Sequence, residues 1–168
     1  MEKEYVGLAG EYAVASEICR RGHFAHLTYG NNKEADILVY ADRTFVKVEV
    51  KSKTGNKWPF IKGIPDDGAH LMIFVDFDKK ESNERPNFYI ITGSEWKNML
   101  PNLEDVKNNP DYIGEDPKDN HTPLWKDGNK GIGIRVRDID QQLEKWEKLD
   151  ELLIKGDMPT KCDSNQCD

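Results

Sequence analysis

The sequence predicts an α/β domain in which a mixed central β-sheet is flanked by helices. Apolar residues recur at a helical period through the first twenty residues, and short segments of strand length follow between residues 23 and 92. A second helical period occupies residues 140–154. Because 168 residues is the length of one domain, we expect a single domain over residues 1–154 and a disordered tail over residues 155–168.

Residues 2–21 carry apolar side chains at the spacing of an α-helix. The residues that recur at intervals of three and four are Leu8, Tyr12, Ala15, Ile18 and Cys19. This spacing predicts that they share one face of the helix. Gly22 follows two arginines and is typical of a helix C-terminus.

A three-stranded meander is expected after this helix. The expected strands are residues 23–29, 35–40 and 45–53, with turns at residues 30–32 and 41–44. In the third strand, Val46, Val48 and Val50 alternate with charged residues. Since successive side chains of a strand point to opposite faces, one face is apolar and the other carries Lys47, Glu49, Lys51 and Lys53.

The later elements are predicted from apolar runs and punctuation by glycine and proline. We expect a loop over residues 54–70, strands over residues 71–77, 87–92 and 132–136, a short helix over residues 95–100 and a final helix over residues 140–154. Ser94 is the expected N-cap of the short helix. Residues 102–130 are predicted to form a long surface excursion around Trp125, and the final helix to bury Leu143, Trp146, Leu149 and Leu153.

The composition is that of a very polar protein. Charged residues make up 33% of the chain, the mean hydropathy is -0.78, and no window has the apolar length that a bilayer-spanning helix needs. The segment MEKEYVGLAGEY is acidic and lacks the apolar centre of a signal peptide. Three cysteines favour reduced thiols over a disulfide framework. We therefore expect a cytoplasmic protein with no membrane partner.

Charge is distributed unevenly along the chain. The formal net charge is -7, yet residues 1–63 carry 10 Lys and Arg against 8 Asp and Glu. Five lysines fall within sixteen residues, namely Lys47, Lys51, Lys53, Lys57 and Lys62. They predict a local positive surface on an acidic protein, or simply a solvated lysine-rich face.

Two carboxylates and an ammonium group are expected to converge on the second and third strands. If residues 35–40 and 45–53 pair in antiparallel fashion around the intervening turn, Asp36 faces Glu49, and Lys51 neighbours Glu49 on the same face. Carboxylate oxygens hold Mg²⁺, which takes its remaining ligands from water and substrate phosphate. A metal polarises a phosphodiester and lowers the pKa of bound water, and a lysine offsets the developing negative charge.

Each of these residues also has an ordinary structural interpretation. Glu49 and Lys51 can form a surface ion pair of little energetic value on an exposed strand. Asp36 can fix the turn that precedes its strand, and Glu11 can be an exposed carboxylate of the first helix. The catalytic interpretation depends on the order of the three elements.

That order resembles the PD-(D/E)XK nuclease superfamily, and within it the archaeal Holliday-junction resolvases and restriction-endonuclease-like proteins. The resemblance rests on a helix with Gly7, Gly10 and Glu11, a strand that opens with Asp36, and a strand that contains Glu49-Val50-Lys51. It covers residues 5–53, about a third of the chain. The chain departs from the family pattern where Ala35 replaces the proline before the aspartate, a position that contributes no ligand.

The resemblance implies a restriction-endonuclease-like fold and a role for each motif residue. Asp36, Glu49 and the carbonyl of Val50 would ligate Mg²⁺, for which Mn²⁺ substitutes, and Glu11 would approach the same site. Lys51 would position water or stabilise charge. The residues expected to contact nucleic acid are Lys47, Lys53, Lys57 and Lys62. The products implied are a 5′-phosphate and a 3′-hydroxyl.

The function expected from the resemblance is that of a metal-dependent endodeoxyribonuclease acting on DNA. Overall acidity opposes phosphate binding, which suggests a basic partner subunit or a restricted contact surface. The alternative is a catalytically inactive nuclease-fold protein that serves as a binding or regulatory subunit in a defence or phage-related complex. Cutting both strands symmetrically would favour a homodimer. The sequence does not separate DNA from RNA.

Overall fold

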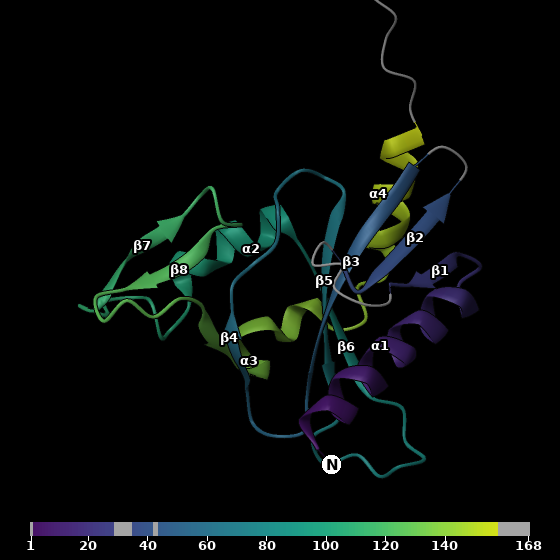
Figure 1. Cartoon of the computed structure of the whole chain (residues 1–168), viewed down its shortest axis with the longest axis horizontal. Coiled ribbons are helices and arrows are strands. Elements are labelled where there is room, and N and C mark those ends of the chain that lie inside the picture. The colour runs from purple at the N-terminus through teal and green to yellow at the C-terminus, as the bar shows by residue number, and fades with distance from the viewer. Residues whose placement is uncertain (1, 29–34, 42–43, 158–168) are drawn as a thin grey trace, which may run out of the picture.

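A computed structural model describes residues 2–28, 35–41 and 44–157 (Figure 1). The helices are α1 (Lys3–Arg20), α2 (Gly93–Met99), α3 (Val136–Ile139) and α4 (Glu147–Asp157), with single 3₁₀ turns at Leu100–Asn102 and Asp140–Gln142. The strands are β1 (Phe24–Leu27), β2 (Ile37–Ala41), β3 (Thr44–Lys53), β4 (Trp58–Ile61), β5 (His70–Asp76), β6 (Asn87–Thr92), β7 (Tyr112–Asp116), β8 (Thr122–Trp125) and β9 (Ile132–Ile134).

Five of these strands form the central sheet. Its order is β1-β2-β3-β5-β6, and all neighbours are antiparallel except the parallel pair β3 and β5. The expectation of a mixed central sheet flanked by helices is therefore confirmed. The expected strands 71–77 and 87–92 are confirmed as β5 and β6.

Each face of the sheet has its own apolar core. On one face, the β3 valines and the β5 residues Leu71, Ile73 and Val75 pack against α1 and α4. On the other face, Met72 and Phe74 of β5 pack against residues from β4, β9 and α2. Every residue of β5 is buried, because the strand lies between the two cores, and this explains its almost continuous apolar sequence.

Helix α1 turns a different face to the sheet from the one that its apolar spacing predicts. Val6, Val14 and Ile18 are buried, whereas Leu8 and Tyr12 are about half exposed and Cys19 is exposed. Gly10 decides this orientation, because a Cβ at that position would lie 2.9 Å from the Cβ of Ser52 on β3. The predicted buried face was therefore wrong, since a small residue allows the helix to approach the sheet closely.

A buried carboxylate also fixes the orientation of α1. Glu17 accepts hydrogen bonds from Arg85 at 2.9 Å and from Arg21 at 2.5 Å. The hydrogen bond from Arg85 contributes most to lowering the pKa of Glu17 to about 2, against the opposing effect of burial. Arg85 also binds Glu144 through two hydrogen bonds of 2.8 Å. The network joins α1 to the segments before β6 and α4.

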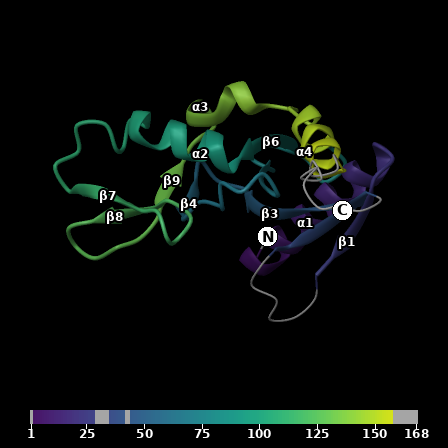
Figure 2. The same ribbon diagram turned by 90° about the horizontal axis from the view of Figure 1, so that it is seen from above.

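Two expectations about the connecting segments were wrong, and the expected surface excursion contains regular structure. Residues 54–70 contain strand β4, which pairs with β9, and the N-cap of α2 is Thr92, which forms a capping box with Glu95. Residues 102–130 contain the hairpin β7–β8, which projects away from the central sheet beyond β4 and β9 (Figure 2). Within it, Trp125 donates a hydrogen bond to the Gly131 carbonyl at 2.7 Å, which indicates a packing role.

The expected helix over residues 140–154 is shorter than its spacing predicts. Glu144 has a φ of 56°, which is incompatible with a continuing helix, and α4 begins only at Glu147. Trp146, Leu149 and Leu153 are buried as expected, whereas Leu143 is 43% exposed. Helix α4 extends into the expected tail to Asp157, and residues 158–168 lie outside the described part of the chain. Among the described residues, no helix has the length and apolarity to cross a membrane.

Candidate active site

Strands β2 and β3 bring the predicted carboxylates to one place. The ladder between β2 and β3 ends where Ile37 is paired with Val48, so Asp36 lies just before β2, beside the segment of β3 that contains Glu49. The Asp36 amide donates to the Val48 carbonyl at 3.0 Å, and the Val50 amide donates to Oδ2 of Asp36 at 2.7 Å. These two bonds fix the backbone and the side chain of Asp36 against β3.

Lys51 lies beside Glu49 on the same face of β3. Its Nζ is 3.0 Å from Oε2 of Glu49, and the two side chains are 35% and 25% exposed. The pair is therefore partly accessible to a solute at the sheet surface. Because both side chains are partly exposed, the Lys51–Glu49 ion pair contributes little to the stability of the fold. Its contribution to stability therefore does not explain why these two residues are paired.

Glu11 approaches the same cluster from helix α1. Partial burial raises the pKa of Glu11, the negative charge of Asp36 raises it further, and Lys51 lowers it. Close packing at Gly10 positions this part of α1 against β3. Glu11, Asp36 and Lys51 are thus near enough to interact electrostatically, although they come from three separate elements.

Glu11, Asp36 and Glu49 offer carboxylate oxygens, the ligand type that a divalent cation such as Mg²⁺ prefers. Within the described residues, no three or more carboxylate, histidine or cysteine side chains are grouped closely enough to form a ready cage for a metal. Mg²⁺ does not need such a cage, because it commonly binds one or two carboxylates and keeps several waters. The unfavourable charge of Asp36 on Glu11 is what a cation would relieve. The donor set therefore fits Mg²⁺.

Lys53 has a different role from the phosphate contact that its position in the lysine-rich segment predicts. It is only 5% exposed, and its Nζ lies 2.5 Å from Oδ1 of Asp76 and 2.9 Å from the Gly55 carbonyl. The ammonium group also lies 4.6 Å from the centre of the Trp58 ring. The prediction for Lys53 is corrected, because a buried and paired ammonium group is not presented to DNA.

Asp76 at the end of β5 suggests in sequence an extra metal ligand or a solvated carboxylate, whereas the structure buries it and pairs it with Lys53. Its carboxylate also accepts a hydrogen bond from the Asp78 amide at 2.9 Å. The available signal was its position at the end of a buried strand, because β5 is parallel to β3 and pairs Asp76 with Lys53. The Lys53–Asp76 ion pair lies at the end of β3, two residues beyond Lys51.

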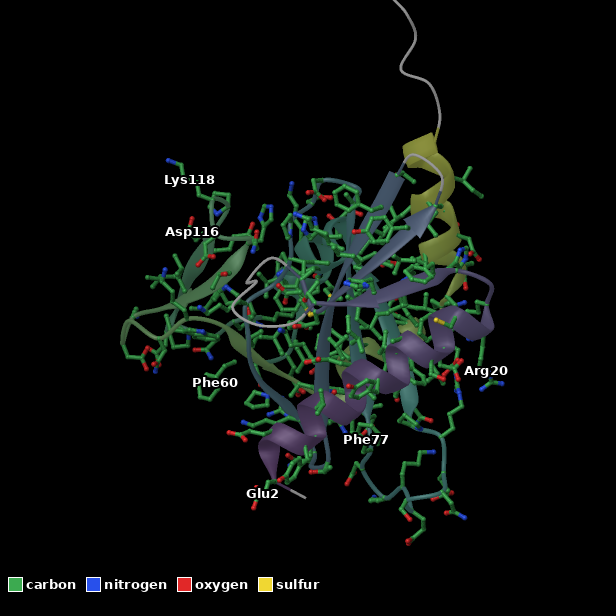
Figure 3. All side chains as sticks on the ribbon, turned by 45° about the vertical axis from the view of Figure 1, so that its right-hand side comes forward. Glu2, Arg20, Phe60, Phe77, Asp116 and Lys118 are labelled. Atoms are coloured by element: carbon green, nitrogen blue, oxygen red, sulfur yellow. The ribbon has the colours of Figure 1, made fainter. Side chains whose placement is uncertain are left out.

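The other predicted lysines stay at the surface. Lys57 and Lys62 are exposed at the two ends of β4, and Lys47 is partly exposed on β3. Lys57 lines a hollow of about 640 Å³ beside β4, β9 and the β7–β8 hairpin, and exposed Phe60, labelled in Figure 3, is another lining residue. None of the four candidate catalytic residues lines this hollow. Cavity size therefore does not point to the four candidate catalytic residues.

A solved structure of a nuclease is similar to this chain in overall fold. The solved structure of the bacterial homing endonuclease I-Ssp6803I matches with a TM-score of 0.48 and 14% sequence identity, over 93% of this chain and 96% of that chain. No protein-family model matches the chain, and no curated protein matches it in sequence.

Proposed function

We propose that this protein is a metal-dependent endonuclease that hydrolyses DNA phosphodiester bonds. The observation that supports it best is the position of Asp36, which accepts a hydrogen bond from the Val50 amide at 2.7 Å, next to Glu49 and to Lys51, whose Nζ is 3.0 Å from Glu49. Two carboxylates beside an ammonium group are suited to phosphoryl transfer, which depends on positioning and on neutralising charge. Glu11 on α1 is near enough for the negative charge of Asp36 to raise its pKa.

Each residue of the proposed site has a distinct task. Asp36 and Glu49 would hold Mg²⁺ together with the Val50 carbonyl, and Mn²⁺ would substitute. The Val50 amide donates to Asp36. Since the N–H and C=O of one strand residue point to the same edge, the Val50 carbonyl is directed toward the same side of β3 as Asp36. When bound, the metal polarises the scissile phosphate and makes water a better nucleophile.

Lys51 would act on the charge that develops at the phosphate. In the absence of substrate its ammonium group is paired with Glu49. With Glu49 as a metal ligand, the Lys51 ammonium group would orient water or neutralise a phosphate oxygen. Glu11, whose pKa is raised by burial and by Asp36, would accept a hydrogen bond from a water at the same site.

The test is cleavage of labelled single-stranded, duplex, flap and four-way-junction DNA, with one RNA for comparison. We expect cutting that requires Mg²⁺ or Mn²⁺, is lost in Glu49→Gln, and leaves 5′-phosphate and 3′-hydroxyl ends. Glu4→Gln is the matched control, because Glu4 is an exposed carboxylate on α1. Equal cutting by wild type and Glu49→Gln would refute the proposal.

A catalytically inactive binding or regulatory subunit remains the alternative function. Calorimetric titration with Mg²⁺ and Mn²⁺ separates the two, because a nuclease site must bind metal and Asp36→Asn must weaken that binding. Absence of both metal binding and cutting would favour the inactive subunit.

A further inference from the structure

The face of β1, β2 and β3 that carries the proposed catalytic residues also carries a row of aromatic side chains. Phe24 is paired with Tyr40, and Tyr40 is paired with Phe45. Paired residues of antiparallel strands project from the same face, so the three rings form a row across the sheet. The Tyr40 and Phe45 rings are in contact, with centroids 6.3 Å apart. We call these three residues the aromatic row.

This face of β1–β3 is accessible in the described part of the chain. Phe24 is 67% exposed, and Tyr40 and Phe45 are 47% and 46% exposed. The core that covers the same face over β5 and β6 includes no described residue of β1, β2 or β3. These strands lie at the side of the molecule away from the β7–β8 hairpin (Figure 1). Large exposed aromatic groups in a continuous patch mark interaction sites in soluble proteins.

The aromatic row is continuous with the proposed catalytic site. Between the two lies a row of His26, Leu38 and Lys47, which are paired with one another across the strands. Phe45, Lys47 and Glu49 are alternate residues of β3 and project from the same face. At about 3.3 Å per residue, the Cα atoms of Phe45 and Glu49 lie about 13 Å apart. A ligand that runs along β3 would meet Phe45, then Lys47, then Glu49, with Tyr40 and Phe24 beside Phe45 on the neighbouring strands.

The chemistry of this path matches a single DNA strand. Exposed rings stack on unpaired bases whatever their sequence, and a sheet with projecting aromatic side chains is a known platform for such stacking. Lys47 supplies a cation for phosphate on the way to the cleavage point. Bases inside an uninterrupted duplex are stacked on one another and do not offer their faces to rings on a flat sheet.

We propose that the β1–β3 face binds a single-stranded DNA segment next to the scissile phosphate, with unpaired bases stacked on Phe24, Tyr40 and Phe45. The substrate class is then DNA with an unpaired segment, such as a flap or a fork. The inference rests on the proposed nuclease function for the position of the cut. The binding itself is measurable without cutting.

The experiment measures binding of a fluorescent oligodeoxythymidine, a flap and a blunt duplex by anisotropy, with EDTA present so that no strand is cut. Leucine replaces each ring of the aromatic row in turn, which keeps apolar volume and removes the π face. We expect Phe45→Leu and Tyr40→Leu each to weaken binding of the single strand and the flap by about fivefold or more. Duplex binding should change less than twofold.

Aromatic and aliphatic replacements separate stacking from other kinds of contact. Phe45→Trp should keep wild-type affinity for the single strand, because tryptophan retains the stacking face. Phe60→Leu is the matched control, since Phe60 is 75% exposed on β4 and lies outside the row. Thermal melting checks each variant. If Tyr40→Leu or Phe45→Leu unfolds, Phe24→Leu carries the test, because Phe24 is the most exposed of the three on the edge strand β1.

Several results would overturn the inference. Wild-type affinity of Phe24→Leu, Tyr40→Leu and Phe45→Leu for the single strand would do so, as would equal losses for single strand and duplex. Apolar docking of a protein or of a second copy would leave DNA binding unchanged and alter the sedimentation behaviour instead. Metal-dependent cutting without an effect of the row refutes only this inference. Strand binding through the row without any cutting refutes only the nuclease function.

Discussion

Replacing Lys53 by methionine should destabilise the fold without removing a DNA contact. Lys53 and Asp76 are each more than 90% buried, and their side chains meet at 2.5 Å between parallel strands. Methionine has a similar length and no charge. The substitution leaves the Asp76 carboxylate buried with the Asp78 amide as its remaining partner. The ammonium contact with the Trp58 ring is lost as well.

The magnitude follows from the burial of both partners. Breaking a buried ion pair from one side costs about 3–5 kcal/mol, because an uncompensated charge remains. The lost cation–π contact is worth about 1–2 kcal/mol and is contained within that range. The double variant Lys53→Met with Asp76→Leu removes both charges, and such replacements are often neutral. We therefore expect the double variant to recover most of the loss.

Urea unfolding of the wild type, both single variants and the double variant measures this directly. The coupling free energy from the four proteins should exceed about 2 kcal/mol, as it does for residues in one buried network. The salt dependence of DNA binding should keep its slope in Lys53→Met. Unchanged stability together with a shallower slope would contradict the reasoning and restore Lys53 as a phosphate contact.

Three further predictions concern packing, titration and charge. Gly10→Ala should lower the free energy of unfolding by about 1–3 kcal/mol, because the new Cβ would overlap Ser52. Gly7→Ala should raise it by up to about 1 kcal/mol, because a Cβ there meets nothing within 4 Å and alanine favours a helix. Urea unfolding measures both variants. Glu17→Gln should lose at most about 3 kcal/mol at neutral pH, since the folded-state pKa is lowered from 4.5 to about 2. This contribution is fully present above about pH 4.5 and disappears as the pH falls toward 2, so the gap between wild type and variant should narrow over that window; a constant gap would contradict the assignment. Lys57→Ala should reduce the slope of log affinity against log salt by about 1 if Lys57 contacts phosphate, and an unchanged slope would exclude that contact.

The elements that the sequence predicts well are those with a strong local pattern. The alternation in residues 45–53 predicts β3 and its two faces, and the short turn before it predicts the antiparallel pairing of β2 with β3. The apolar run of residues 71–77 predicts a strand covered on both faces. Local periodicity is sufficient here because β2 and β3 are neighbours in both sequence and space.

The failures all depend on contacts between distant segments. The orientation of α1 is decided by a glycine against Ser52 and by Glu17 binding an arginine far along the chain, and neither contact alters the apolar spacing. Lys53 resembles Lys51 in sequence, yet its partner Asp76 lies 23 residues away. Strand β4 has only four residues and includes Pro59, so it resembles a loop until β9 pairs with it. Local pattern carries no information about such partners.

The aromatic row could not be predicted from the sequence for a different reason. Phe24, Tyr40 and Phe45 each resemble an ordinary strand residue, and β-strands are rich in aromatic residues. Their significance comes from register and from the lack of cover on one face, and neither is visible in a one-dimensional pattern.

The most direct test of the central claim compares Lys51→Met with Glu49→Gln on a DNA substrate that the wild type cuts. Single-turnover cleavage and calorimetric Mg²⁺ binding are measured on the same preparations. If the assigned roles are right, Lys51→Met still binds Mg²⁺ but cuts at least about a hundredfold more slowly, whereas Glu49→Gln loses both metal binding and cutting. Cleavage by Lys51→Met at the wild-type rate, or undiminished Mg²⁺ binding by Glu49→Gln, would contradict the account.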